Sequence, residues 1–187
     1  MPTVLDRPTG AIHEFAVGHP WLTVPVIVIT AACIAWCPLA LVLAWLRSRK
    51  LRPIAATVLG LALADQVSYA IGSLGFRPRP FVALRFAPLF PHSPNTSFPS
   101  STTAFAAATA IVVLLAWRRL GVTLVLGTAM IAFGCVYVGV HYVSDVVFGA
   151  LIGAACGGGA WLAMGLGPAK KFLGQIDHRI AQRRSSG

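Results

Sequence analysis

The sequence predicts an all-helical bundle embedded in a membrane. The chain has 187 residues, of which 57% are hydrophobic and only 11% are charged, and its mean hydropathy is +0.77. Because soluble domains carry about 25% charged residues, this composition excludes an ordinary soluble protein. Apolar segments of spanning length alternate with polar or basic stretches. We expect five spans in a single domain over residues 1–187, with an interfacial N-terminal helix as a sixth element.

The first part of the chain contains a lead-in and two predicted spans. Residues 1–20 lack a continuous apolar run and are predicted to be an external lead-in. Residues 21–46 form the first span, in which Pro25 and Pro38 predict bends. Residues 54–74 form the second span. A short basic stretch joins the two spans.

One acidic residue, Asp65, interrupts the second span. A carboxylate is costly in contact with lipid tails, and polar side chains within spans usually face the bundle interior. We therefore expect Asp65 to face inward, paired with Gln66, Tyr69 or a buried water.

The second part of the chain begins with a polar loop, residues 75–99, which is rich in Pro and Arg. Three apolar segments follow, over residues 100–117, 120–138 and 146–166. The last of them carries glycines at four-residue spacing, which predict a face that another helix approaches closely: Gly149, Gly153 and Gly157. Residues 168–187 form a basic tail.

The basic residues divide unequally between the two predicted sides. Eleven of the fifteen Lys and Arg residues fall in the loops and the tail of one side, which the positive-inside rule assigns to the cytoplasm. The lead-in and the loop 75–99 then lie outside. Three arginines in that external loop contradict the rule, and an anionic ligand is the simplest reason for them: Arg77, Arg79 and Arg85.

The net charge of +10 does not indicate nucleic acid, since the basic residues flank the spans, where anionic lipid headgroups attract them. The four cysteines lie inside apolar segments without the spacing of a zinc site: Cys33, Cys37, Cys135 and Cys156. We expect no disulfide, metal or cofactor.

A histidine and an aspartate stand four residues apart where the last span begins. If a helix starts at Val143, Asp145 lies near its N-terminus and can reach one ring nitrogen of His141, leaving the other nitrogen free to attack. The alternative interpretation is an interfacial histidine beside an aspartate that only caps the helix.

Two further polar stretches reach the same external surface in this topology. In residues 77–80, Arg77 and Arg79 alternate with prolines, which suits the holding of a phosphate. Ser100, Ser101 and Thr102 open the third span with hydroxyl groups and unpaired N–H groups, which can cradle an anion or simply cap the helix.

The stretches FRPRPF, SFPSSTTAF and YVGVHYVSD resemble the three signature motifs of the type 2 phosphatidic acid phosphatase superfamily. Within it they are most similar to undecaprenyl diphosphate phosphatases of the bacitracin-resistance type. The resemblance implies hydrolysis of a lipid diphosphate or phosphate at the outer leaflet of a bacterial cell membrane. It assigns the nucleophile that becomes phosphohistidine to His141, its orienting carboxylate to Asp145, phosphate binding to Arg79 and Arg77, and further donors to Ser100.

The chain departs from the family pattern at two catalytic positions. Thr102 stands where the family has the histidine that protonates the leaving group, and Cys135 where it has a phosphate-binding arginine. Neither replacement can do the lost task, although we expect both positions to face a polar external cavity. Each loss typically costs a factor of about 10² to 10⁴.

Two functional hypotheses follow. The first is a weakened hydrolase that favours a diphosphate, whose leaving group needs a proton least. The second is a degenerate relative that binds a lipid phosphate or serves as a subunit of a membrane complex, with a protein partner or a second copy of itself. His92 in the external loop can replace the missing acid or be an ordinary solvated histidine.

Overall fold

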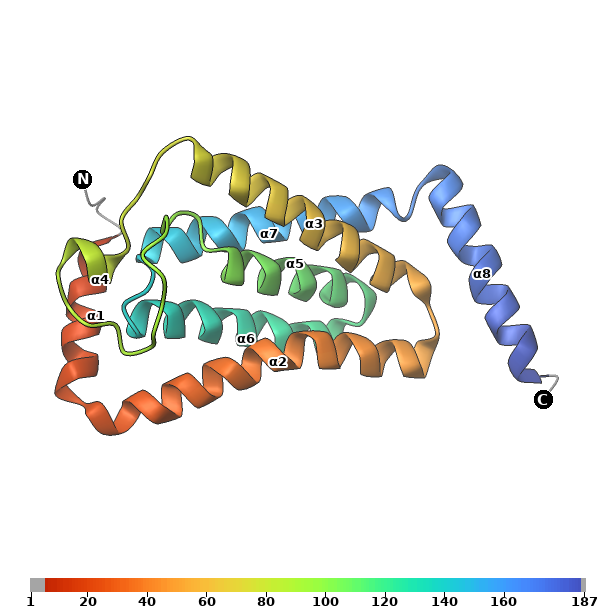
Figure 1. Cartoon of the computed structure of the whole chain (residues 1–187). Coiled ribbons are helices and arrows are strands. Elements are labelled where there is room, and N and C mark those ends of the chain that lie inside the picture. The colour runs from red at the N-terminus through yellow and green to blue at the C-terminus, as the bar shows by residue number, and fades with distance from the viewer. Residues whose placement is uncertain (1–5, 186–187) are drawn as a thin grey trace.

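The computed structural model describes residues 6–185, and these residues form a bundle of helices (Figure 1). α1 lies at one end of the bundle and α8 at the other, so the described part of the chain begins and finishes at opposite ends. The elements in order are α1 (Arg7–Gly18), the short 3-10 helix η2 (Pro20–Leu22), α2 (Thr23–Ser48), α3 (Leu51–Ser73), α4 (Pro80–Ala83), α5 (Ser101–Ala116), α6 (Arg118–Tyr137), α7 (Val143–Ala163) and α8 (Gly167–Ser185).

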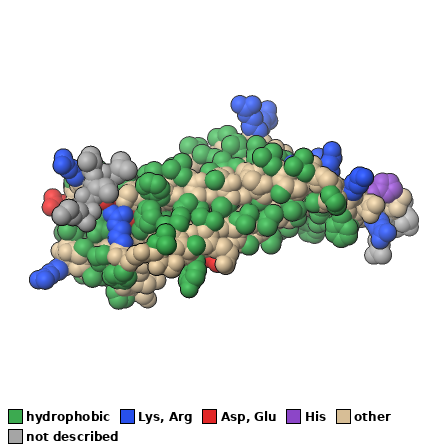
Figure 2. Space-filling view, turned by 90° about the horizontal axis from the view of Figure 1, so that it is seen from above, with side chains coloured by type: hydrophobic (Ala, Val, Ile, Leu, Met, Phe, Trp, Pro, Cys, Tyr) green, Lys and Arg blue, Asp and Glu red, His purple; other side chains and the backbone are tan. Residues whose placement is uncertain are grey.

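Four helical segments are long and apolar enough to cross a membrane, namely Pro20–Ser48, α3, α6 and α7. Hydrophobic side chains cover most of the body between its two ends (Figure 2). α5 is apolar too, but its 16 residues extend only about 24 Å, less than the roughly 30 Å of a hydrocarbon core. The structure therefore supports an integral membrane protein with four full-length spans and one shorter central helix.

The short helix α5 is the centre of the bundle. It packs against α3, α6 and α7, whereas α2 packs mainly against α6 and touches α3 little. The N-terminal end of α5 is set back from the end of the bundle where α7 begins (Figure 1). The loop before α5 can therefore enter the bundle, and its residues reach the interior from that end.

The predicted glycine face is confirmed at the contact between α7 and α5. A Cβ atom on Gly153 would collide with the backbone carbonyl oxygen of Ala104 in α5, so the two helices meet closely here. We expect Gly153→Leu to lower the free energy of unfolding by about 3 kcal/mol or more, because the helices would have to separate. Thermal unfolding in detergent measures this. Gly159→Leu is the matched control, since open space surrounds that position, and equal losses in both variants would contradict the packing argument.

Three other expectations concern α3, α8 and α2. Asp65 does not face the interior as predicted: it is exposed on the outer face of α3, where the Gln66 amide lies 3.5 Å away. The buried face of α3 carries small residues that pack on α5 and α7, and Asp65 is not on this face. The basic tail is helical as α8, and Asp177 in it accepts a hydrogen bond from the Leu51 backbone N–H. α2 continues through Pro38 and changes direction along its length (Figure 1).

Candidate active site

The three motifs meet at the end of the bundle where α5 and α7 begin. Two backbone hydrogen bonds join them: the Ser97 N–H donates to the Arg77 carbonyl oxygen at 2.8 Å, and the Ser100 N–H donates to the Asp145 carbonyl oxygen at 3.1 Å. The first residues of α5 and α7 are thereby held together with the arginine segment. The predicted convergence of these segments is confirmed.

His141 lies in the turn before α7, which begins at Val143 as the sequence predicts. Asp145 is fully buried, and its Oδ2 atom lies 3.5 Å from His141 Nδ1. The same oxygen accepts hydrogen bonds from the Ser97 hydroxyl and, at 2.9 Å, from the Tyr142 backbone N–H. Tyr142 is the N-cap of α7, and Asp145 at the third helical position accepts a hydrogen bond from the Tyr142 backbone N–H while also facing the histidine, so Asp145 stabilises the start of the helix without being its N-cap.

Arg79 reaches the other side of the histidine ring. Its Nη1 atom donates to the Val140 carbonyl oxygen at 2.9 Å and contacts His141 Nε2 at 3.2 Å, while its Nε atom donates to Asn95 Oδ1 at 2.9 Å. The side chain is buried, and burial lowers the pKa of Arg79, an effect that the nearby Asp145 partly opposes. A guanidinium that is buried among uncharged acceptors is well suited to bind an anion.

These contacts fix the chemical form of the histidine. A guanidinium can only donate hydrogen bonds, so Nε2 of His141 is the acceptor and carries the lone pair. The ring proton of neutral His141 then lies on Nδ1, the atom that faces Asp145. An anion bound to Arg79 would meet the unprotonated nitrogen, which is the arrangement that a nucleophilic histidine needs.

Arg77 lies elsewhere than the sequence predicts. Its guanidinium binds Asp6 at 2.6 Å and Asp145 at 2.7 Å, donates to the Ser144 hydroxyl at 2.7 Å and lies over the Tyr142 ring. Burial raises the pKa of the Tyr142 phenol, while the Arg77 charge opposes that rise. With two carboxylates as partners, Arg77 holds Asp145 in place. Asp6 was missed because nothing in residues 1–20 distinguishes it.

The three hydroxyl residues at the start of α5 have separate roles. Ser100 is the N-cap: it is fully buried, and its Oγ accepts from the Thr103 backbone N–H at 3.4 Å. Ser101 is exposed. Thr102 lines a cavity of about 180 Å³ that also contains Cys135, His92 and His141. The structure thus brings Thr102 to the same cavity as His141, whereas Ser100 caps the helix.

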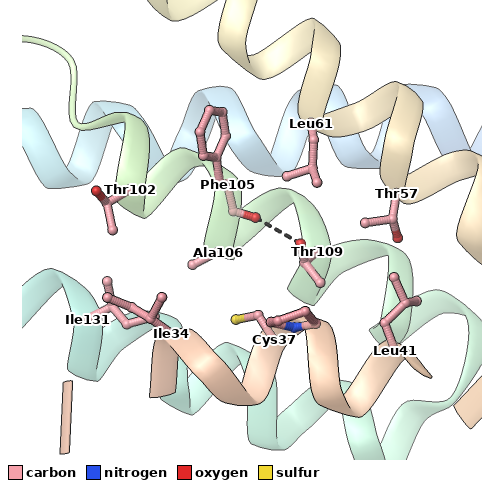
Figure 3. Close-up of a pocket in the computed structure, with 11 residues that line it drawn as sticks. Ile34, Cys37, Leu41, Thr57, Leu61, Thr102, Phe105, Ala106, Thr109 and Ile131 are labelled. Carbon is pink, nitrogen blue, oxygen red and sulfur yellow. Dashed lines mark hydrogen bonds between the residues drawn. The ribbon is translucent and has the colours of Figure 1, made fainter. Parts of the chain in front are cut away.

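This cavity is not the polar one expected around Thr102 and Cys135, since most of its lining is apolar. α2 and the turn before α7 supply aliphatic side chains there, and Phe90 adds an aromatic ring. A second apolar cavity of about 340 Å³ adjoins it, and Ile34 and Thr102 line both. Figure 3 shows the second cavity, lined from α2, α3, α5 and α6, with Thr102 near the start of α5.

No group of three His, Cys, Asp or Glu side chains within the described part of the chain is arranged to hold a metal ion. The charged groups at the candidate site are therefore Arg79, Arg77 and the two carboxylates that bind Arg77.

Residues 53–166 match the sequence profile of the PAP2 superfamily, and they include every motif residue described above. The chain belongs to the PAP2 superfamily. It is 35% identical over 141 residues to the undecaprenyl-diphosphatase BcrC of Bacillus subtilis (strain 168). The aligned region covers 73% of this chain and 72% of the relative. It is 33% identical over 155 residues to the putative undecaprenyl-diphosphatase YbjG of Escherichia coli (strain K12), covering 78% and 77%.

Solved PAP2 structures share the fold. The crystal structure of Aquifex aeolicus LpxE superposes with a TM-score of 0.68 and 26% identity, covering 84% of this chain and 94% of that one. The PAP2-type phosphatidylglycerolphosphate phosphatase of Bacillus subtilis superposes with a TM-score of 0.65 and 23% identity, covering 82% and 83%. The resemblance drawn from three short motifs is confirmed for the family and for the helical membrane fold.

Within this PAP2 protein, part of the site lies outside the region that the family profile matches. Asp6 binds Arg77 from the segment before α1, and α2 supplies Ile34 to both cavities. The PAP2 region of residues 53–166 carries His141, Asp145 and Arg79. Asp6 therefore supports Asp145 through Arg77, and α2 forms one wall of the two apolar cavities.

Proposed function

We propose that this protein hydrolyses a polyprenyl diphosphate through a phosphohistidine intermediate. One observation carries the proposal: buried Arg79 contacts Nε2 of His141 at 3.2 Å, while Nδ1 of the same ring faces buried Asp145 at 3.5 Å. PAP2 membership and similarity to proteins named undecaprenyl-diphosphatase support a lipid phosphatase.

The reaction takes place in two steps. The terminal phosphate binds to Arg79, and His141 Nε2 attacks its phosphorus atom as the bond to the leaving oxygen breaks. The lipid monophosphate departs, and the phosphorylated ring, still protonated on Nδ1, is a cation that Asp145 stabilises. Water then attacks the phosphorus atom, inorganic phosphate leaves, and His141 returns to its neutral form.

The cavities support a lipid as the substrate. The 180 Å³ cavity at His141 and the adjoining 340 Å³ cavity share Ile34 and Thr102, so an apolar space continues from the nucleophile toward the middle of the bundle. α2 makes few contacts with α3, and a flexible hydrocarbon chain can occupy the space between them.

A diphosphate suits the site better than a monoester. No histidine stands at position 102, and a lipid monophosphate leaves without a proton more readily than an alkoxide does. We place the site on the outer side of a bacterial cell membrane and α8 in the cytoplasm, because the two ends of the chain lie at opposite ends of the bundle and α8 is basic.

The second candidate function is a catalytically degenerate relative that binds a lipid phosphate or serves as a subunit of a membrane complex. The presence of Thr102 and Cys135 beside the nucleophile favours it. Purification in mild detergent separates the two: a dedicated subunit retains a stoichiometric protein partner, and an enzyme need not.

Purified protein in detergent, assayed with undecaprenyl diphosphate and a metal chelator, tests the proposal. We expect release of inorganic phosphate and a radiolabelled phosphoenzyme that acid destroys and alkali preserves, as phosphohistidine chemistry requires. Release no greater than from a mock purification, or binding of the lipid without any turnover, would refute the hydrolase and support the degenerate relative.

A further inference from the structure

A second histidine lines the cavity at His141, and the sequence alone leaves its role open. His92 belongs to the loop between α4 and α5, and it lines the same cavity of about 180 Å³ as His141, Thr102 and Cys135. The loop reaches this position because the Ser97 N–H is tied to the Arg77 carbonyl oxygen and Asn95 accepts a hydrogen bond from Arg79. His92 is therefore three residues from Asn95, whose side chain is bonded to Arg79 beside His141.

We propose that His92 is the proton donor to the leaving group in this protein, in place of the residue missing at position 102. This inference rests on the proposed function and adds the acid that the two-step reaction lacks.

The other side chains of the cavity cannot supply the proton. The titratable groups that line it are His92, Cys135 and His141. His141 is the nucleophile, and the thiol of Cys135 and the hydroxyl of Thr102 are weak donors at neutral pH. Imidazole is the one remaining group whose pKa lies near the working pH.

The charges around His92 determine when it carries a proton. Burial, followed by the charge of Arg79 and the proximity of His141, lowers the pKa of His92 in the free protein. No carboxylate lines this cavity within the described residues. A bound diphosphate brings negative charge beside Arg79 and so favours the protonated imidazole. The acid form is therefore stabilised when substrate is present, and activity should decline as the pH rises through the pKa of His92.

The proton balance is complete in this scheme. As His141 Nε2 bonds to phosphorus, the bond between phosphorus and the leaving oxygen breaks, and the imidazolium of His92 transfers its proton to that oxygen. Neutral His92 then accepts a proton from the water that attacks the phosphohistidine. Inorganic phosphate leaves, and both histidines return to their initial forms.

His92→Gln tests the inference with two lipids of the same chain, undecaprenyl diphosphate and undecaprenyl monophosphate. The monophosphate must release an alkoxide, so we expect its kcat to fall by about 100-fold or more, and that of the diphosphate by less than about 10-fold. His178→Gln in α8 is the matched control, an exposed histidine at the far end of the bundle. The kcat of His92→Gln for the monophosphate should also no longer decline at high pH, as that of the wild type does.

A second variant separates the loss of an acid from a disturbed loop. Thr102→His should restore monophosphate hydrolysis in the His92→Gln background by about 10-fold or more, because both positions face the same cavity. Equal kcat values for wild type and His92→Gln on the monophosphate would overturn the inference, as would a wild type that hydrolyses only the diphosphate. A wild type inactive on both lipids would instead overturn the proposed function.

Discussion

Replacing His141 with alanine is expected to lower kcat for undecaprenyl diphosphate by about 10⁴-fold or more, since removal of a covalent nucleophile leaves only binding and charge stabilisation. His141 is the one residue that contacts Arg79 through one ring nitrogen and faces Asp145 through the other. Phosphate release under saturating lipid measures the change. The radiolabelled phosphoenzyme should disappear in the same variant.

His178→Ala provides the control for this prediction, because it removes an imidazole from α8, outside the site. It should keep full activity and a normal phosphoenzyme. If His141→Ala released phosphate as fast as the starting protein, the activity would belong to a contaminant or to another nucleophile.

Replacing Asp145 with asparagine is expected to lower kcat by about 10² to 10⁴-fold and to destabilise the fold by about 3 kcal/mol. Asp145 is fully buried and accepts hydrogen bonds from Ser97, Tyr142 and Arg77. An amide supplies only one acceptor oxygen, and its NH₂ group would face a donor. It also no longer balances the positive charge of the phosphorylated His141 ring.

Asp6→Asn separates the catalytic effect from the structural one. Asp6 shares Arg77 with Asp145 and accepts a further hydrogen bond from the Ser144 hydroxyl, whereas Asp145 also faces His141. We expect a comparable loss of thermal stability in detergent and a decrease in kcat of less than about 10-fold. If both variants lost activity equally, Asp145 would act only by holding the loops together.

The local sequence determined the fold class and the pairing of His141 with Asp145. Hydrophobic segment length and the distribution of basic residues are properties of short stretches, so they predicted the membrane bundle without any tertiary contact. The relation between His141 and Asp145 was equally accessible, because a helix that begins at Val143 places the two side chains one turn apart. The span over residues 100–117 was predicted slightly too long, since Ser100 caps α5 and Trp117 ends it.

Tertiary packing decided the roles of residues whose partners are distant in sequence. Arg77 fits a phosphate site by its type, but Asp6, 71 residues earlier, and Asp145, 68 residues later, bind it instead. Asp65 lies on the outer face of α3 because small residues occupy the inner face. His92 lies at the same cavity as His141 because its loop folds back onto Arg79. Composition and periodicity describe neighbours along the chain, whereas these partners are set by which helices pack together and by where α5 ends inside the bundle.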